Sequence, residues 1–327
     1  MRELAETARQ WAAEGRTAFL ARPVTEQGFG PRDPGGALLV DPRGECVGGM
    51  YRGVFDAELA AEAAAMPAGR TARVCEVSVG GDEAVAARLT CGGQAEVLLQ
   101  PLSSVPTAWW DLLAEGVGVA LVTRLNETAD AAESTVVPAV AEPSSDADRR
   151  ALELLATHRA GRDALYAESG LVLVEAVPSA PFVVIGGGGE LAAIIARQVR
   201  LLEWEAVVVE NAEEAFEVIA ARRDAACLVM LSHEPEFDVP VLRHALARRV
   251  PYVGALGSRR TQTRRREALL SAGVTEAELR AIHGPIGLDL GARTPAETAL
   301  AITAEILGVL GNRRAGALRD TDGPLNS

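Results

Sequence analysis

Lysine is missing from this 327-residue chain, and all 32 of its basic residues are arginine. Set against 45 aspartates and glutamates, they leave a formal net charge of −13. An acidic surface repels the phosphates of nucleic acids, so we expect no nucleic acid partner. In our interpretation the missing lysine reflects coding bias rather than function.

Cysteine and histidine are scarce, with four residues of each. They are Cys46, Cys75, Cys91, Cys227, His158, His233, His244 and His283. No C-x-x-C or H-x-x-x-H pair occurs among them, so neither a metal site nor a disulfide framework is predicted. A single cysteine is more often a small buried hydrophobe than a nucleophile.

Long apolar runs are also lacking. Acids and prolines interrupt each run well before the roughly 20 residues that a membrane span needs. The first residues carry acids among their apolar side chains and show no continuous apolar stretch of the signal-peptide type. We therefore expect a soluble, cytoplasmic protein with no membrane partner.

What the chain does have is a phosphate-binding pattern in residues 182–210, FVVIGGGGELAAIIARQVRLLEWEAVVVE. An apolar β-branched run ends in four glycines, a helix-forming stretch follows, and a second apolar run ends in an acid. Gly187, Gly189 and Ala192 fit the G-x-G-x-x-G/A fingerprint of a dinucleotide-binding βαβ unit. Glu210 follows at the spacing of roughly 20 residues that the fingerprint requires.

The chemistry of this pattern follows from its geometry. Glycines allow positive φ and a close backbone approach, and a helix N-terminus offers unpaired N–H groups to an anion. The Glu210 carboxylate would accept a hydrogen bond from a ribose hydroxyl and repel a 2′-phosphate, which favours NAD over NADP. The alternative is a glycine turn that packs tightly and binds nothing.

The rest of the C-terminal half alternates between strands and helices, which predicts a doubly wound parallel sheet of the Rossmann type. We expect strands at 226–231 and 252–256 and helices at 212–222, 240–248 and 295–310. The last helix begins at Thr294-Pro295-Ala296-Glu297, a capping box with proline at the first helical position.

The N-terminal half predicts an α+β domain built mostly of sheet. We expect helices at 1–14, 56–66 (with Asp56 as N-cap), 106–116 and 149–169, and strands at 17–22, 74–79, 84–89, 96–100, 117–125 and 171–177. An acidic surface loop occupies 126–148, within which 136–140 could pair as an edge strand. Two prolines within 178–181 mark the boundary, which gives domains at 1–178 and 181–311 and a frayed tail at 312–327.

Polar residues follow the predicted strands at the edge where parallel sheets bind ligands. His233 could transfer a proton at a cofactor, or it could cap a backbone carbonyl. Ser258 offers a hydroxyl N-cap, and Arg259 offers a guanidinium group that suits a phosphate.

Three further features of the sequence concern an arginine run, an aspartate and a cysteine. Arg264, Arg265 and Arg266 form a solvated helix face in our interpretation. Asp289, between two glycines, could bind substrate, pair with an arginine or stabilise its turn. Cys91, in a glycine-rich turn, could present a thiolate to a ligand or be a plain turn thiol.

Long strings of the sequence resemble the xanthine dehydrogenase accessory protein family, XdhC/CoxI. They are SHEPEFD at 232–238, YVGALGSRRT at 252–261, PIGLDLGARTPAETALAITAEI at 285–306, GPRDPGGALLV at 30–40, LTCGG at 89–93 and LVLVEAVPSAP at 171–181. The resemblance covers nearly the whole chain. It implies an N-terminal XdhC-like α+β domain followed by a Rossmann-like domain.

The resemblance also implies a function. Family members are described as proteins, often dimeric, that bind molybdenum cofactor, protect it during sulfuration and deliver it to a xanthine dehydrogenase-type apoenzyme. For this chain it implies a molybdopterin-type cofactor, a homodimer and a molybdenum hydroxylase apoenzyme as partner. Arg32 and Cys91 would join the glycine turn and the Ser258-Arg259 pair in cofactor binding.

The chain departs from the family pattern at three places. The family string S-G-G-C-V-E corresponds to RGVFD at 52–56, so Val54 stands where the family has cysteine. The string G-S-S-P-R corresponds to GFGPR at 28–32, which keeps Arg32 and loses the hydroxyls. In the glycine turn, Glu190 replaces a histidine.

A rival hypothesis is an NAD-dependent oxidoreductase acting on a small metabolite. It rests on the intact Gly187, Gly189 and Glu210, with His233 or Asp289 as the catalytic proton-transfer group. A third hypothesis is a non-catalytic scaffold that binds a nucleotide as a regulator.

Overall fold

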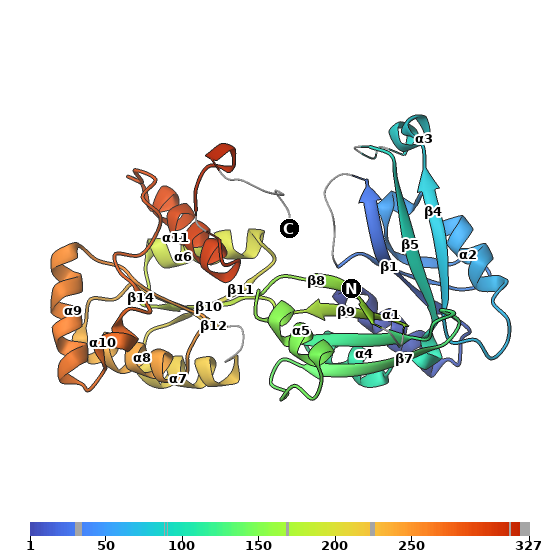
Figure 1. Ribbon diagram of the computed structural model, residues 1–327. Coiled ribbons are helices and arrows are strands. Elements are labelled where there is room, and N and C mark those ends of the chain that lie inside the picture. The colour runs from blue at the N-terminus through green and yellow to red at the C-terminus, as the bar shows by residue number, and fades with distance from the viewer. Residues whose placement is uncertain are drawn as a thin grey trace. The chain divides into compact units, whose positions relative to one another are not determined.

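The computed structural model describes residues 1–29, 35–87, 89, 91–167, 170–222, 226–313 and 315–320 (Figure 1). The chain divides after Pro178 into two compact units. The first unit starts at Met1 and the second at Ser179.

The first unit is an α+β structure with two antiparallel sheets. Its strands are β1 (Phe19–Gly28), β2 (Ala37–Val40), β3 (Cys46–Gly49), β4 (Arg73–Val79), β5 (Gly93–Pro101), β6 (Val119–Leu125), β7 (Ala132–Pro138), β8 (Gly161–Ala167) and β9 (Gly170–Val177). Its helices are α1 (Ala5–Ala13), α2 (Asp56–Ala64), α3 (Gly81–Ala86), α4 (Thr107–Ala114) and α5 (Asp146–Leu155), with 3-10 helices η1 (Arg2–Leu4), η2 (Tyr51–Gly53) and η3 (Leu102–Ser104). The strand orders are β3-β2-β1-β5-β4 and β7-β6-β9-β8.

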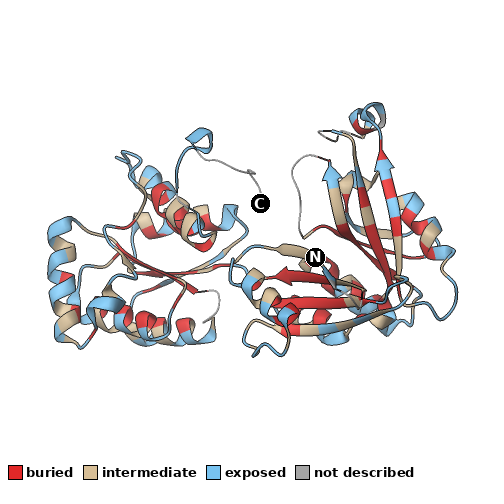
Figure 2. Ribbon diagram, viewed as in Figure 1, coloured by how far each residue is buried: buried red, intermediate tan, exposed pale blue. Residues whose placement is uncertain are grey.

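Successive side chains along a strand point to opposite faces of its sheet. Each sheet can therefore pack on one neighbouring layer with each of its faces. Leu98 of β5, Leu125 of β6 and Leu173 of β9 share a core cluster between the two sheets. On the outer faces, α2 packs on the first sheet and α5 on the second. Buried positions accordingly follow the strands, and exposed ones follow the outer sides of the helices (Figure 2).

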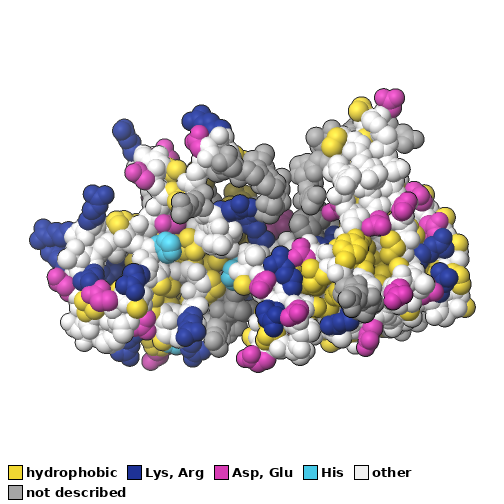
Figure 3. Space-filling view, viewed as in Figure 1, with side chains coloured by type: hydrophobic (Ala, Val, Ile, Leu, Met, Phe, Trp, Pro, Cys, Tyr) yellow, Lys and Arg dark blue, Asp and Glu magenta, His cyan; other side chains and the backbone are white. Residues whose placement is uncertain are grey.

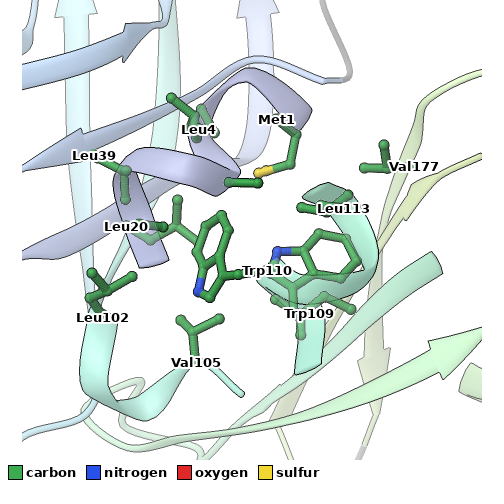
Figure 4. Close-up of a cluster of buried hydrophobic side chains, with 14 of the residues drawn as sticks. Met1, Leu4, Leu20, Leu39, Leu102, Val105, Trp109, Trp110, Leu113 and Val177 are labelled. Atoms are coloured by element: carbon green, nitrogen blue, oxygen red, sulfur yellow. The ribbon is translucent and has the colours of Figure 1, made fainter. Parts of the chain in front are cut away.

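Helices α1 and α4 close one end of this interior. Trp109 and Trp110 of α4 lie among Leu4, Leu20 and Val105 (Figure 4). Both tryptophan side chains are almost fully buried. The burial of large aromatic side chains is a main source of the stability of this unit.

A buried polar cluster also joins the two sheets. Arg22 of β1 is 0% exposed and donates hydrogen bonds to Glu175 of β9 and to Gln100 of β5. Arg162 of β8 donates to the other oxygen of the same carboxylate, with Nε to Oε1 at 3.0 Å. Because a buried charge is tolerated only when it is paired and hydrogen-bonded, this cluster fixes the two sheets against each other.

Three local predictions in this unit are wrong. The strand expected at 84–89 is replaced over its first residues by α3, in which Ala84 is buried while Val85 is exposed. The helix expected at 149–169 ends at Leu155, and β8 follows it because pairing with β9 overrides helix propensity. Asp56 is the first residue of α2 rather than its N-cap, which is Phe55.

The second unit is a parallel sheet covered by helices on both faces. Its strands are β10 (Phe182–Gly186), β11 (Glu205–Val209), β12 (Ala226–Met230), β13 (Tyr252–Ala255) and β14 (Ile282–His283). Its helices are α6 (Glu190–Leu201), α7 (Ala212–Ala221), α8 (Pro235–Ala247), α9 (Arg259–Ser271), α10 (Glu276–Leu279) and α11 (Pro295–Leu310), with the 3-10 helix η4 (Leu318–Asp320). The strand order is β11-β10-β12-β13-β14.

The predicted doubly wound α/β fold is confirmed. Helices α6 and α11 share a core cluster with one face of the sheet, while α7, α8 and α9 share another with the opposite face. The capping box of α11 is present, with Thr294 and Glu297 exchanging the expected hydrogen bonds. Helix α8 starts at Pro235, five residues before the predicted start, and contains Pro240 in its interior. Of the predicted tail, only 312, 313 and 315–320 are described.

We expect Glu175→Gln to lower the free energy of unfolding of the first unit by about 3–5 kcal/mol, because it leaves two buried guanidinium groups without a charged partner. Urea unfolding followed by tryptophan fluorescence measures this, since three of the four tryptophans lie in the first unit. The control is Glu153→Gln, which removes an exposed ion pair with Arg150 and should cost less than about 1 kcal/mol. Equal effects of the two substitutions would contradict the prediction.

Candidate functional site

The glycine turn after β10 adopts the geometry that its sequence predicts. Gly187 has φ +100°, and a Cβ there would lie 3.0 Å from the Ser232 nitrogen. Gly189 has φ +97° and is the N-cap of α6. A Cβ built on Gly189 meets no atom within 4 Å among the described residues, so the space in front of this helix end is open. Backbone N–H groups at such an end attract anions.

Two carboxylates lie at this turn. Glu210 follows β11, and its Oε1 lies 2.7 Å from where a Cβ on Gly188 would stand. Glu190, the first residue of α6, is exposed. The negative charge of Glu210 disfavours a second phosphate here and suits a hydroxyl donor. Ala192, the third fingerprint position, is buried against the sheet and serves helix packing.

The strand order places the turn at the switch point of the sheet. The first strand, β10, lies between β11 and β12, and the chain leaves β10 toward one edge and later returns to the other. Ligands of doubly wound sheets bind at the carboxyl ends of the strands at this point. Ser232 follows β12 and touches the turn at Gly187, so these two loops lie side by side at the carboxyl ends of β10 and β12.

Arg265 ties this edge together, and the prediction that it is a solvated residue is wrong. Its side chain is 5% exposed, and its Nη2 lies 2.8 Å from Asp238 Oδ2. It also donates to the carbonyl oxygens of Ser232 at 3.2 Å and Leu256 at 3.0 Å. The loops after β12 and β13 are therefore held by one guanidinium group. Burial raises the pKa of Asp238, and the Arg265 charge opposes that rise.

The other predicted residues of this unit lie at the same edge, more exposed. Ser258 is the N-cap of α9, and its hydroxyl accepts from the Thr261 N–H at 3.2 Å. Arg259 is the first residue of that helix and is exposed. His233 and Asp289 are exposed as well. No proton-transfer partner of His233 or Asp289 emerges from the described contacts, so their catalytic role stays a prediction.

Glu305 of α11 is a site residue that the sequence did not reveal. Its Oε2 accepts from the Tyr252 hydroxyl at 2.5 Å and from the Gly287 N–H at 2.9 Å, and its Oε1 lies 3.5 Å from His283 Nδ1. It thereby anchors the loop that carries Asp289. Burial alone would raise the pKa of Glu305, but hydrogen bonds from His283, Tyr252 and Gly287 outweigh it and hold the pKa below 4.5.

In the first unit, two motif loops come together. Gly28 at the end of β1 passes so close to the turn before β5 that a Cβ would lie 2.3 Å from the Gly92 oxygen. Cys91 is exposed on that turn, and Arg32 lies outside the described residues. A hollow of about 510 Å³ lies nearby, lined by Gln27, Gly28, Ser78, Val79, Gly80, Gly93 and Gln94.

Left-handed backbone conformations occur next to Gly28 and in the 3-10 helix η2. Phe29 has φ 64°, Tyr51 50° and Arg52 57°, conformations that cost about 1–3 kcal/mol each in a non-glycine residue. Phe29 and Tyr51 stack with ring centroids 4.2 Å apart, and the Tyr51 hydroxyl donates to Glu26 at 2.6 Å. Val54 packs against the core cluster beneath them. Residues with strained backbone cluster at functional sites, and no residue pattern in the sequence predicts them here.

Metal and membrane features are not found in the described parts of the chain. No group of three or more histidine, cysteine or acidic side chains is arranged there to hold a metal ion. Within the same residues, no helix is both long and apolar enough to span a bilayer.

Comparison with known families decides the relationship. The family described as XdhC and CoxI family matches residues 11–78, and the XdhC Rossmann domain matches residues 183–306. The chain belongs to the XdhC and CoxI family. In this XdhC/CoxI protein, the first match includes the strained loop at Tyr51, and the second includes the glycine turn, Arg265 and Glu305.

Two relatives from Escherichia coli (strain K12) share parts of the sequence. The chain is 26% identical over 190 residues to the uncharacterized protein YqeB, covering 51% of this chain and 35% of YqeB. It is 35% identical over 82 residues to the molybdenum cofactor insertion chaperone PaoD, covering 25% of this chain and 26% of PaoD. The matched segments thus span about a third and a quarter of these relatives.

A solved structure shares the fold over almost the full length. It is a crystal structure of a protein from Bacillus halodurans described as a xanthine dehydrogenase, with a TM-score of 0.62 and 18% identity. The likeness covers 96% of this chain and 97% of the other. At this identity it shows a common fold and nothing further about the XdhC/CoxI protein.

We expect the Glu305 contacts to make the stability of the second unit pH-dependent. The folded pKa lies below the ordinary value of 4.5, so the contribution is fully present above pH 4.5 and is lost as the pH falls through the folded pKa. Glu305→Gln should therefore cost about 1–3 kcal/mol at pH 7 and less in acid.

Thermal unfolding of both proteins between pH 7 and pH 3 measures the difference. Glu217→Gln, an exposed carboxylate on α7, serves as control and should change little at any pH. A Glu305→Gln deficit that stays constant down to pH 3 would refute the assignment.

Proposed function

We propose that this XdhC/CoxI protein binds molybdenum cofactor and assists its sulfuration or insertion into a xanthine dehydrogenase-type molybdenum hydroxylase. Family membership carries the proposal. The segment shared with PaoD, a molybdenum cofactor insertion chaperone, supports it. The role is that of an accessory protein, which holds a cofactor for another enzyme.

The second unit offers a fit for the phosphate of such a cofactor. Gly187 and Gly189 have positive φ, and the space before α6 is open at Gly189. The cofactor's phosphate would accept hydrogen bonds from backbone N–H groups at this helix end. Glu210 would accept a hydrogen bond from an N–H or O–H group of the ligand. The bound cofactor supplies the molybdenum chemistry of the recipient enzyme, while these residues bind and orient it.

The first unit offers a thiol. Cys91 is the exposed cysteine, whereas Cys75 and Cys227 are buried and Cys46 is half-buried. Burial raises the pKa of Cys75 to about 11 and that of Cys227 to about 12, so neither forms a thiolate at neutral pH. Among the four, Cys91 is therefore the most accessible to a ligand.

We expect the protein purified without oxygen to carry a pterin that yields a fluorescent oxidised derivative after iodine treatment. Gly187→Ala should reduce the pterin content severalfold, because its Cβ would press on the Ser232 backbone and close the turn. Gly273→Ala is the control, since it also replaces a positive-φ glycine of the second unit but meets open space among the described residues. Wild-type protein without pterin would argue strongly against the proposal.

One observation favours a second function, an NAD-dependent oxidoreductase. The Glu210 carboxylate lies against the glycine turn, where the dinucleotide fingerprint places the acceptor for a ribose hydroxyl. Arg259 and Ser258 stand after β13, two strands from β10 in the sheet, and would contact the other parts of a dinucleotide. His233 or Asp289 would then exchange a proton with substrate.

Calorimetry with NAD, NADH and NADPH tests this alternative. We expect Glu210→Ala to weaken NAD binding by about 1–3 kcal/mol through loss of a charged hydrogen bond. Glu190→Ala, which removes the other carboxylate of the turn, should not weaken it. If none of the three nucleotides binds, the oxidoreductase hypothesis is rejected, whereas the proposed accessory role is not affected.

A further inference from the structure

A small hollow opens on the second unit, and no residue of the glycine turn lines it. It has a volume of about 180 Å³ and lies between α9, α10 and β14. The lining residues are Gln262, Arg265, Arg266, Leu269, Glu276, Leu279, Arg280, Ile282 and Gly284. Sites for small molecules usually measure about 300–1,000 Å³, so this one suits a single side chain better than a cofactor.

The floor of the hollow is apolar and its polar walls are already satisfied. Leu269 is buried, and Leu279 and Ile282 are half-buried beside it. Gln262 donates to the Ala255 carbonyl oxygen at 2.8 Å and accepts from Arg265 Nη1 at 2.9 Å. Because the polar side chain of Gln262 already forms hydrogen bonds within the protein, the hollow favours an apolar side chain as its occupant.

The rim carries positive charge. Arg266 pairs with Glu276, while Arg280 is exposed and forms no ion pair with the residues that the structure describes. Arg259 lies on the same helical stripe as Gln262, Arg266 and Leu269, because these positions are spaced i, i+3, i+7 and i+10. Arg280 at the rim, and Arg259 one turn before Gln262 on the same face of α9, are therefore available to carboxylates.

The surrounding sequence is basic in an acidic protein. From position 243 to position 280 the chain has nine arginines and three acidic residues, although its net charge is −13. Dark blue side chains project from the part of the surface where Figure 1 draws α9 (Figure 3). Such segregation of charge favours an acidic partner at this face.

We infer that this hollow receives an apolar side chain from an acidic segment of a partner protein. Arginine binds carboxylates in a bidentate manner, and a side chain that fills a pocket behind a water-excluding rim can contribute much of the binding energy of an interface. A nucleic acid fits less well, since no aromatic side chain lines the hollow for base stacking. If the proposed function holds, the partner is the molybdenum hydroxylase.

Arg265 connects the hollow to the loops at the carboxyl ends of β12 and β13. The same side chain lines the hollow and holds the carbonyl oxygens of Ser232 and Leu256. An occupant of the hollow therefore touches the group that fixes the loops after β12 and β13. The docking of the partner and the position of these two loops therefore both depend on Arg265.

The test uses the full ¹⁵N-labelled chain and a capped pentapeptide with one leucine between two pairs of glutamates. We expect amide shifts confined to residues 259–284 and a dissociation constant of about 0.1–1 mM, as for one small anchor. Arg280→Glu should weaken binding by about fivefold or more, because it replaces attraction by repulsion. Arg264→Glu, the same charge change at an exposed position off the stripe, is the matched control and should stay within about twofold.

Three outcomes would overturn the inference. One is equal binding of a peptide with alanine in place of leucine, which would mean that the hollow is unused. Another is equal weakening by the two arginine substitutions or full competition by single-stranded DNA, which would indicate nonspecific attraction of polyanions. The third is a set of amide shifts that lies outside residues 259–284. Because the peptide needs no cofactor, binding by protein that carries no pterin would keep the docking site while rejecting the proposed function.

Discussion

The hydrogen bonds of the Arg265 guanidinium group are the interaction on which the loops at the carboxyl ends of the strands in the second unit depend. Parallel strands end side by side at one edge of a sheet, and the loops that leave them carry backbone carbonyl groups that need partners. Arg265 supplies donors to two of these loops and takes its counter-charge from Asp238. Ser232, held in this way, in turn supports the glycine turn at Gly187. The phosphate-binding geometry of one loop thus rests on a side chain from a helix about 80 residues further along, in keeping with the way non-local contacts set functional sites.

Local rules predicted much of this unit from the sequence. The glycine turn, the acid at Glu210 and the capping box at Thr294 each depend on a few neighbouring residues, and their stereochemistry leaves little choice. Arg265 was mistaken for a surface residue because it stands in a run of three arginines, where sequence cannot tell which one faces inward. Glu305 escaped notice for the same reason, since its partners come from β13 and from the loop after β14. The fold follows from periodicity, whereas buried polar contacts follow from tertiary packing.

The first unit was harder to predict than the second. Antiparallel strands with half-buried faces give weaker patterns than buried parallel ones, and alanine-rich stretches fit helix or strand until packing decides. The strained backbone at Phe29 and Tyr51 could not be foreseen, because positive φ in these residues is held by surrounding contacts rather than by their own preference. Both positions lie within the segment that matches the XdhC and CoxI family, and their aromatic rings stack on each other.

The lysine-free composition acquires a physical meaning at Arg22. A lysine at a fully buried position can give up its proton, since its pKa falls readily on burial, whereas a guanidinium group stays charged in proteins. The positive charge between the two sheets of the first unit is therefore permanent, and its partners come from both sheets. Neither sheet can peel away alone without stranding that charge in apolar surroundings. The buried charge therefore couples the two sheets, although the chain passes between them once, through the segment that contains η3 and α4.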